Sequence, residues 1–219
     1  MIEQGSLSFV YEDENEPYVY KKNESSVDTA VLDTLLQLND PRVLSPLEYT
    51  KGKFVIELYP KIQAPPLVDY FHQTPDLDKR DIANIMIECS LATRTLHENN
   101  ICHRDIHLGN FFWNNQKALI FDYNRSSFMG PNTHDYRYLT PIQIREIQES
   151  CPQYPQEEFL FGHPITEKYD IYSLAVLFES LTTPWASNRK LTKIISRAKQ
   201  PFPKRTKNIE QFLDELHSI

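Results

Sequence analysis

Three polar side chains in the middle of the chain form the set most capable of chemistry. Asp105 lies in segment 101–110, which ends at Asn110, and Asp122 directly follows the apolar stretch 119–121. A carboxylate can orient an attacking hydroxyl, while carboxylate and amide oxygens are ligands that magnesium accepts. Phosphoryl transfer from ATP requires this set of residue types. We therefore predict Asp105 as the catalytic carboxylate, and Asn110 and Asp122 as ligands of Mg2+.

The order of residues around Asp105 resembles the protein kinase family. His103, Arg104 and Asp105, followed by Asn110, match the catalytic-loop pattern HRDxxxxN, and Asp122 stands where the family has its DFG aspartate. The resemblance implies an α+β, bilobal protein-kinase-like fold with a small β-rich N-lobe and a larger α-helical C-lobe. It also implies an ATP-dependent protein kinase that transfers the γ-phosphate to a protein hydroxyl, with Ser/Thr favoured over Tyr.

Further kinase motifs occur in the family's order along the chain. Residues 2–11 resemble the glycine-rich strand pair, 18–21 the VAIK strand, 54–59 the hinge strand, 137–141 the activation segment, 169–174 helix F and 203–206 a late PxxRPT signal. The resemblance makes Lys21 the phosphate-contacting lysine and Ile56 the gatekeeper, and it brings the backbones of Glu57 and Tyr59 to the adenine. The full set of expected nucleotide-binding residues is Gly5, Val10, Val19, Lys21, Glu57, Tyr59 and Phe112.

The local patterns also change along the chain from strands to helices. Strand-forming runs at 6–11, 18–20, 44–49 and 53–58 flank a short helical pattern from Val27 to Leu38, with Ser25 or Ser26 as its N-cap. After a proline-rich stretch at 59–66, helices are expected behind an N-capping Asp78, at 171–181 and at 208–216. We predict a single domain over 1–219, with an N-lobe at 1–58, a hinge at 59–63 and a C-lobe at 64–219.

Composition excludes several other classes of protein. The formal net charge of −7 argues against general nucleic-acid binding, and no apolar run approaches the 18 residues of a membrane span. Three cysteines without a CxxC pair favour a reducing cytoplasm over a disulfide scaffold. About 38 residues follow the helix predicted at 171–181, which is short for a kinase and typical of viral and bacterial members.

Several family positions are altered. The outer two glycines of the nucleotide loop are replaced at positions 3 and 8, and Asn124 replaces the DFG glycine. Ile142 replaces the glutamate of the APE motif, so Arg205 needs another acidic partner, for which Glu146 is the candidate. Serine at position 8 is small enough to be tolerated, and asparagine adopts the left-handed backbone better than most residues, so these two changes are milder than the loss of the glutamate.

The helix C glutamate that pairs with the phosphate-contacting lysine is also missing. Alignment of the helix places Val31 opposite Lys21, and Asp28, one turn earlier, is the first candidate to replace the glutamate, ahead of Glu24. Together with the altered loop and DFG motif, this favours a pseudokinase as the alternative function. A pseudokinase would bind nucleotide or a regulatory protein partner without turnover.

The same loop supports two further interpretations. His103, Asp105, His107, Gly109 and Asn110 also resemble the HxDxHxGN loop of small-molecule phosphotransferases such as aminoglycoside and choline kinases. His103 and His107, with the neighbouring cysteine at position 102, could in principle hold zinc, although HxxxH binds zinc best from a helix and a loop is expected here. A protein substrate remains the favoured interpretation, because helix F and the activation segment belong to protein kinases.

Overall fold

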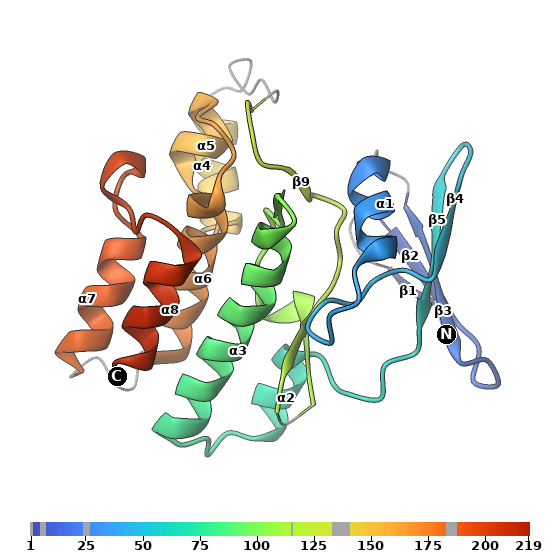
Figure 1. The fold of residues 1–219 in the computed structure, drawn as a ribbon, viewed down its shortest axis with the longest axis horizontal. Helices are drawn as coiled ribbons and strands as arrows, with labels where there is room; N and C mark the ends of the chain where they lie inside the picture. The colour runs from blue at the N-terminus through green and yellow to red at the C-terminus, as the bar shows by residue number, and fades with distance from the viewer. Residues whose placement is uncertain (1, 5–7, 24–26, 115, 133–140, 183–187) are drawn as a thin grey trace.

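An antiparallel five-stranded sheet forms the N-terminal part of the molecule (Figure 1). The computed structural model describes residues 2–4, 8–23, 27–114, 116–132, 141–182 and 188–219. The strand order is β1-β2-β3-β5-β4, so the strands that carry Lys21 and Glu57 are neighbours. The strands are β1 (Ile2–Gln4), β2 (Ser8–Glu12), β3 (Tyr18–Asn23), β4 (Glu48–Lys51) and β5 (Val55–Pro60).

Alternation along β3 and β5 decides which side chains face the interior of the protein. Lys21 lies opposite Glu57 in the ladder, and Val19 lies opposite Tyr59. Side chains of directly opposed residues project to the same face of a sheet, and here Lys21, Glu57 and Tyr59 are buried. Ile56 lies on the opposite face and is 41% exposed, so the prediction that it is the gatekeeper is wrong.

The strand boundaries near the hinge also differ from the prediction. The sequence predicts strands at 44–49 and 53–58, whereas β4 spans Glu48–Lys51 and β5 spans Val55–Pro60. Pairing with β3 extends β5, because Pro60 lies opposite Tyr18 and the amide of Lys61 donates to the Pro17 carbonyl at 2.8 Å. Proline is tolerated at such a strand end, where it need not donate to the ladder.

Helix α1 (Thr29–Gln37) lies beside the sheet (Figure 1). Its N-cap is Asp28, whose Oδ1 accepts from the amide of Ala30 at 3.0 Å; the predicted caps Ser25 and Ser26 lie outside the described residues. After the helix the chain joins the helical part, because the amide of Leu44 donates to the Ile120 carbonyl and the amide of Ile120 to the Arg42 carbonyl, each at 2.9 Å.

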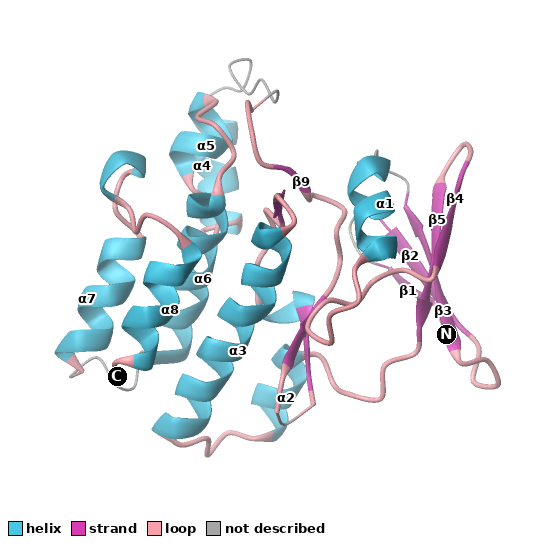
Figure 2. Ribbon diagram, in the orientation of Figure 1, coloured by secondary structure: helices cyan, strands magenta, loops and turns pink. Residues whose placement is uncertain are grey.

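The rest of the chain is mainly helical (Figure 2). Asp78 caps α3 as predicted, in a capping box with Asp81, and the apolar stripe of α3 packs into the core. The rings of Phe178 and Phe212 stack at 5.9 Å between α6 and α8. The helices are α2 (Leu67–Gln73), α3 (Lys79–Glu98), α4 (Pro141–Ser150), α5 (Gln156–Phe161), α6 (Glu167–Thr182), α7 (Arg189–Ala198) and α8 (Ile209–His217), with short 3-10 turns η1 (Leu108–Asn110) and η3 (Phe202–Lys204).

Two small antiparallel ladders hold the loops between these helices. β6 (Ile101–Cys102) pairs with β9 (Ser127–Phe128), and β7 (Phe111–Trp113) pairs with β8 (Ala118–Ile120). The β6–β9 ladder joins the two ends of the segment that contains Asp105, Asn110 and Asp122, the predicted catalytic residue and metal ligands. The fold is therefore the predicted α+β arrangement of a β-rich N-terminal region and a helical C-terminal region. Within the described residues, no helix has the length and apolar character to cross a bilayer.

Candidate active site

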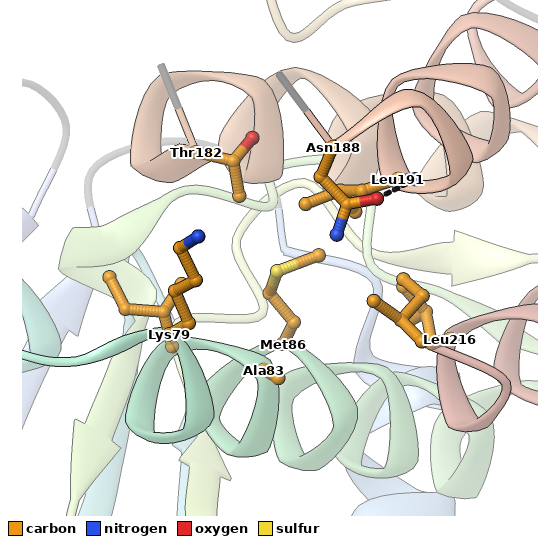
Figure 3. A pocket seen from close by; sticks show the side chains of 9 residues that line it. Lys79, Ala83, Met86, Thr182, Asn188, Leu191 and Leu216 are labelled. Carbon is orange, nitrogen blue, oxygen red and sulfur yellow. Dashed lines mark hydrogen bonds between the residues drawn. The ribbon is translucent and has the colours of Figure 1, made fainter. Parts of the chain in front are cut away.

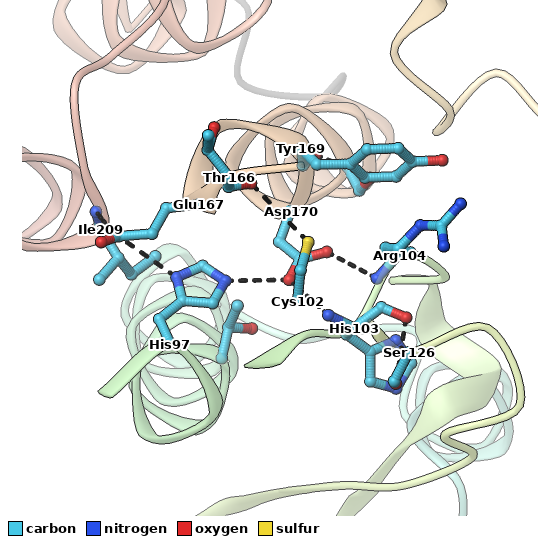
Figure 4. A network of polar contacts seen from close by, with 12 residues as sticks. His97, Cys102, His103, Arg104, Ser126, Thr166, Glu167, Tyr169, Asp170 and Ile209 are labelled. Atoms are coloured by element: carbon cyan, nitrogen blue, oxygen red, sulfur yellow. Dashed lines mark hydrogen bonds and ion pairs between the residues drawn. The ribbon is translucent and has the colours of Figure 1, made fainter. Parts of the chain in front are cut away.

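A buried carboxylate on α6 anchors the loop that carries Asp105. The two oxygens of Asp170 accept the backbone N–H groups of His103 and Arg104, each at 2.8 Å (Figure 4). The imidazole of His97, from the end of α3, donates to the same carboxylate at 2.9 Å. Asp170 is fully buried, so these donors replace the water that the charge loses. The backbone of the loop is thereby fixed to α6 through Asp170, and His97 connects the same carboxylate to α3.

Charge stabilises this anchor. Burial alone would raise the pKa of the Asp170 carboxyl, but the hydrogen bond and charge of His97 outweigh it, and the pKa lies below its ordinary value. Burial alone would lower the pKa of His97, but its interactions with Asp170 and with Glu167, 3.7 Å away, outweigh it and raise the pKa. The two groups therefore favour the charged form in each other.

His103 connects this anchor to the segment around Asp122. Its Nε2 donates to the Phe121 carbonyl at 2.9 Å, and its Nδ1 accepts from the amide of Asp105 at 3.3 Å. The hydroxyl of Ser126 donates to the carbonyl of His103 at 3.2 Å. Arg104, with φ at +66°, has a left-handed backbone that disfavours a non-glycine residue, and the Asp170 hydrogen bond holds it there.

Asp105 is half-buried, and its carboxylate is held by side chains. Tyr154, between α4 and α5, donates its hydroxyl to Asp105 Oδ1 at 2.7 Å. Arg125 Nε lies 3.8 Å from Asp105 Oδ2, and its guanidinium lies 5.3 Å from the centre of the Tyr154 ring. Burial and the charge of Asp105 raise the pKa of the Tyr154 hydroxyl, which keeps its proton and donates it.

Asn110 and Asp122 lie on the side of the loop that faces the sheet. The side-chain nitrogen of Asn110, Nδ2, donates to the Asp105 carbonyl at 2.8 Å. This leaves the side-chain oxygen of Asn110 available as an acceptor. Asp122, with φ at +66°, directs Oδ1 to Lys21 Nζ at 2.7 Å. Burial alone would raise the pKa of Asp122, but the charge of Lys21 outweighs it and lowers the pKa, so the side chain is an anion.

Lys21, Asn110 and Asp122 line a cleft of about 500 Å³ between the sheet and the helical part. This volume lies in the range of small-molecule sites. The stacked rings of Phe112 and Phe121, 4.2 Å apart, line it. The predicted site residues in its wall are Val10, Val19, Lys21, Tyr59, Asn110, Phe112 and Asp122.

The protein kinase domain model matches residues 34–218 of this chain. The chain belongs to the protein kinase family. It is also 26% identical over 181 residues to a probable serine/threonine-protein kinase, gdt4, of Dictyostelium discoideum. That alignment covers 80% of this chain and 10% of the relative, so the kinase matches only a small part of that protein.

One predicted nucleotide-binding residue of the kinase, Glu57, is described by the structure but does not line the cleft. Glu57 is 1% exposed and lies behind Lys21, where its carboxylate accepts hydrogen bonds from the side chains of Asn23 and Tyr59. The prediction assigns it a backbone contact with adenine, whereas the cleft is lined further along by Tyr59, Pro60 and Lys61. The extension of β5 explains the displacement. Gly5 lies outside the described residues, as do Glu24 and most of the activation segment.

Other partners in the kinase differ from those expected from the sequence. Asn124, which replaces the DFG glycine, accepts from Lys21 Nζ at 3.0 Å through its side-chain oxygen. Arg205 pairs with Glu158 of α5, with both side chains fully buried, so the prediction of Glu146 as its partner is wrong. Tyr154 and Glu158 both lie in the stretch between α4 and α6, where no family motif identified a functional residue.

The zinc interpretation finds no support in the side chains concerned. Cys102 directs its thiol to the Thr166 carbonyl at 3.7 Å, and His103 is engaged by the loop backbone. No group of three or more metal-ligating side chains gathers within the described part of the chain. His107 accepts from the Gly109 amide at 3.1 Å, and a Cβ at Gly109 would lie only 3.0 Å from the His107 ring, so a larger residue there would require the ring to shift.

A second, smaller cavity lies among helices α3, α7 and α8, and no residue of the Asp105 loop lines it (Figure 3). Its volume is about 50 Å³, and Met86, Leu191 and Leu216 contribute to its apolar wall. The side chain of Asn188, at its rim, caps α7 by accepting from the amides of Lys190 and Leu191. This arrangement is explained by helix packing and capping.

Proposed function

We propose that this kinase transfers the γ-phosphate of ATP to a serine or threonine hydroxyl of a protein substrate. The observation that carries the proposal is that Lys21, Asn110 and Asp122 line one cleft, and that Asn110 donates to the carbonyl of Asp105 on the same loop. The proposed domain is the whole of 1–219, and a cytoplasmic location is proposed from the cysteine content. The Dictyostelium relative, a probable serine/threonine-protein kinase, also supports serine/threonine specificity.

The residues present fit a nucleotide with magnesium. Asp122 is an anion on the cleft wall, and the free side-chain oxygen of Asn110 supplies a second oxygen ligand. Magnesium in such sites is held by one or two protein oxygens together with phosphate oxygens, and it neutralises the charge that develops on the transferred group. The apolar rings of Phe112 and Phe121 suit a flat base, and Lys21 suits the phosphates.

The chain's own residues then have distinct tasks. Asp105 accepts a hydrogen bond from the substrate hydroxyl, orients its oxygen toward the γ-phosphorus and receives its proton. The new bond joins the substrate oxygen to that phosphorus, and the bond from the phosphorus to the β–γ bridging oxygen breaks, leaving ADP. Lys21 holds the phosphates during transfer. Asp170 acts indirectly, because it fixes the backbone on which Asp105 is placed.

The test is transfer of labelled phosphate from ATP with Mg2+ to a generic basic protein. We expect wild type to label the protein and Asp105→Asn to lose about 10²- to 10⁴-fold in rate, the usual contribution of a general base. Exposed Asp214 on α8 provides the matched control, Asp214→Asn, which should keep the wild-type rate. Equal transfer by Asp105→Asn would contradict the assignment of the catalytic residue.

Two outcomes would redirect the proposal. Absence of transfer by wild type, together with nucleotide-induced thermal stabilisation, would indicate a pseudokinase. Transfer to aminoglycosides or choline, but not to proteins, would indicate the small-molecule class. The presence of Lys21, Asp105, Asn110 and Asp122 together favours an active enzyme over the pseudokinase.

A further inference from the structure

Helix α1 lacks the glutamate that, in the protein kinase family, pairs with the lysine corresponding to Lys21. Val31 is 1% exposed and packs in the core, so α1 presents an apolar side chain there. Asp28, the candidate replacement, is exposed and caps α1 by accepting from the amide of Ala30. Its carboxylate therefore has a local structural task at the start of the helix.

A buried carboxylate lies on the other side of Lys21. Glu57 is directly opposite Lys21 in the β3–β5 ladder, and both side chains are on the buried face of the sheet. Directly opposed residues have Cβ atoms about 4.5–5.5 Å apart. The carboxylate accepts from the Asn23 amide and from the Tyr59 hydroxyl, both neutral donors on the same two strands.

Charge balance connects Glu57 to Lys21. An ionised carboxylate buried without a cation is costly, and neutral donors compensate only part of the lost hydration. Burial raises the pKa of Glu57, and the charge of Lys21 is the strongest influence that lowers it. In this structure Lys21 Nζ donates to Asp122 and Asn124, and Lys21 lines the cleft whereas the buried Glu57 does not.

We propose that Glu57 is the positioning residue for Lys21, acting from strand β5 in place of the glutamate of helix C. The proposal rests on the proposed function, because it assigns Lys21 to the phosphates. If Asp122 held magnesium, Lys21 would lose that partner, and the carboxylate of Glu57 would remain to hold the ammonium group. Because β3 and β5 are hydrogen-bonded neighbours, this pairing does not depend on the position of α1.

The main test is Glu57→Gln, which keeps the shape and an acceptor oxygen but removes the charge. We expect KM for ATP to rise about tenfold, the size of the interaction that the proposal places between the charges of Glu57 and Lys21 once ATP is bound. The matched control is Asp28→Asn, because asparagine also caps helices and should leave KM for ATP unchanged. An unchanged KM in Glu57→Gln, or an equal rise in Asp28→Asn, would overturn the proposal.

A second readout does not require activity. The rate at which a small acylating reagent modifies Lys21, relative to exposed Lys79, is measured by peptide mass spectrometry. We expect Lys21 to react faster in Glu57→Gln, because its side chain loses the carboxylate that holds it in place and becomes more accessible to the reagent. The same variant should also bind Mg·ADP more weakly by calorimetry. Unchanged reactivity and binding would overturn the proposal even if wild type transfers no phosphate, so its failure is distinct from failure of the proposed function.

A third variant covers the case in which Glu57→Gln does not fold. Glu57→Asp keeps the charge and draws it back by one methylene. We expect KM for ATP and the reactivity of Lys21 in Glu57→Asp to be intermediate. Both values should lie between those of wild type and those expected for Glu57→Gln. Wild-type values in a folded Glu57→Asp protein would overturn the proposal.

Discussion

Two regions of the kinase bury a carboxylate and hold it by different means. Asp170, in the helical part, accepts two backbone N–H groups and an imidazole, and the pKa of its carboxyl is lowered. Glu57, in the sheet, accepts from an amide side chain and a phenol, and burial raises the pKa of its carboxyl. Backbone donors are fixed by the fold, whereas side-chain donors can rotate away. The first region is thus suited to structural support and the second to adjustable contacts.

The largest expected effect breaks the Asp170 region. Asp170→Ala leaves the two loop N–H groups and His97 without their acceptor in a fully buried position. We expect the free energy of unfolding to fall by about 3–5 kcal/mol, as for loss of one partner of a buried pair. Urea unfolding followed by circular dichroism measures this change. Asp214→Ala, at an exposed position of α8, should change stability by less than about 0.5 kcal/mol. Similar losses in both variants would contradict the comparison.

The matching change in the Glu57 region should cost less. Tyr59→Phe removes one of the two donors to Glu57 while keeping the ring in place. We expect a loss of about 1 kcal/mol, because the adjacent Lys21 and Asn23 still compensate the carboxylate. The same unfolding experiment measures it. A loss as large as that of Asp170→Ala would show that both regions are equally rigid.

Asp105 extends the comparison to a third carboxylate, which is also held by side-chain donors. The Tyr154 hydroxyl donates to the carboxylate that, in the proposed function, a substrate hydroxyl must reach. Tyr154→Phe removes this competitor, so we expect a severalfold higher rate of protein phosphorylation at low substrate concentration. Initial-rate kinetics with a protein substrate measure the change. A lower rate would mean that Tyr154 positions Asp105 instead of competing for it.

The smallest expected effect is a difference in how stability depends on pH. The raised folded-state pKa of Glu57 means that its contribution is present below the ordinary value of 4.5 and is lost as pH rises through the raised pKa. Asp170 behaves in the opposite way, because its contribution is present above 3.8 and is lost as pH falls through the lowered pKa. The other titratable groups that act on Glu57 are Lys21, Tyr59 and Asp122.

Unfolding free energies of wild type and Glu57→Gln, measured across this pH range, separate the two contributions. We expect the stability of Glu57→Gln relative to wild type to increase as pH rises above 4.5. The acid-side loss that Asp170 produces should remain in both proteins. Parallel pH profiles throughout would remove the distinction drawn between the two carboxylates.

Local signals made much of the site predictable from the sequence. The motif from His103 to Asn110 consists of residues that are close in the chain. Asp78 predicts the start of α3, where it forms a capping box. These features depend on neighbours in sequence, so one segment contains the information. The expected roles of the site residues remain predictions until the variants above are measured.

Features that depend on strand register or on distant segments could not be predicted in the same way. A shift of one residue turns a strand over, so the assignment of the gatekeeper to Ile56 depended on a register that only pairing with β3 determines. Tyr154 and Glu158 reach their partners across 49 and 47 residues of sequence, and no pattern near them indicates those contacts. Asn124 offered a signal, since an amide oxygen beside a predicted metal ligand can accept from a lysine.

The short ladder between β6 and β9 has a consequence for how the protein opens. Residues 101 and 128, and 102 and 127, are paired, and the amide of Met129 donates to the Asn100 carbonyl at 2.8 Å. The ladder closes the chain between them into a loop with a narrow neck, and Asp105, Asn110 and Asp122 all lie inside it. Amide protons at the neck should therefore exchange with deuterium as one cooperative unit. Because Asp105, Asn110 and Asp122 share this neck, we expect breaking of the ladder to expose all three residues together.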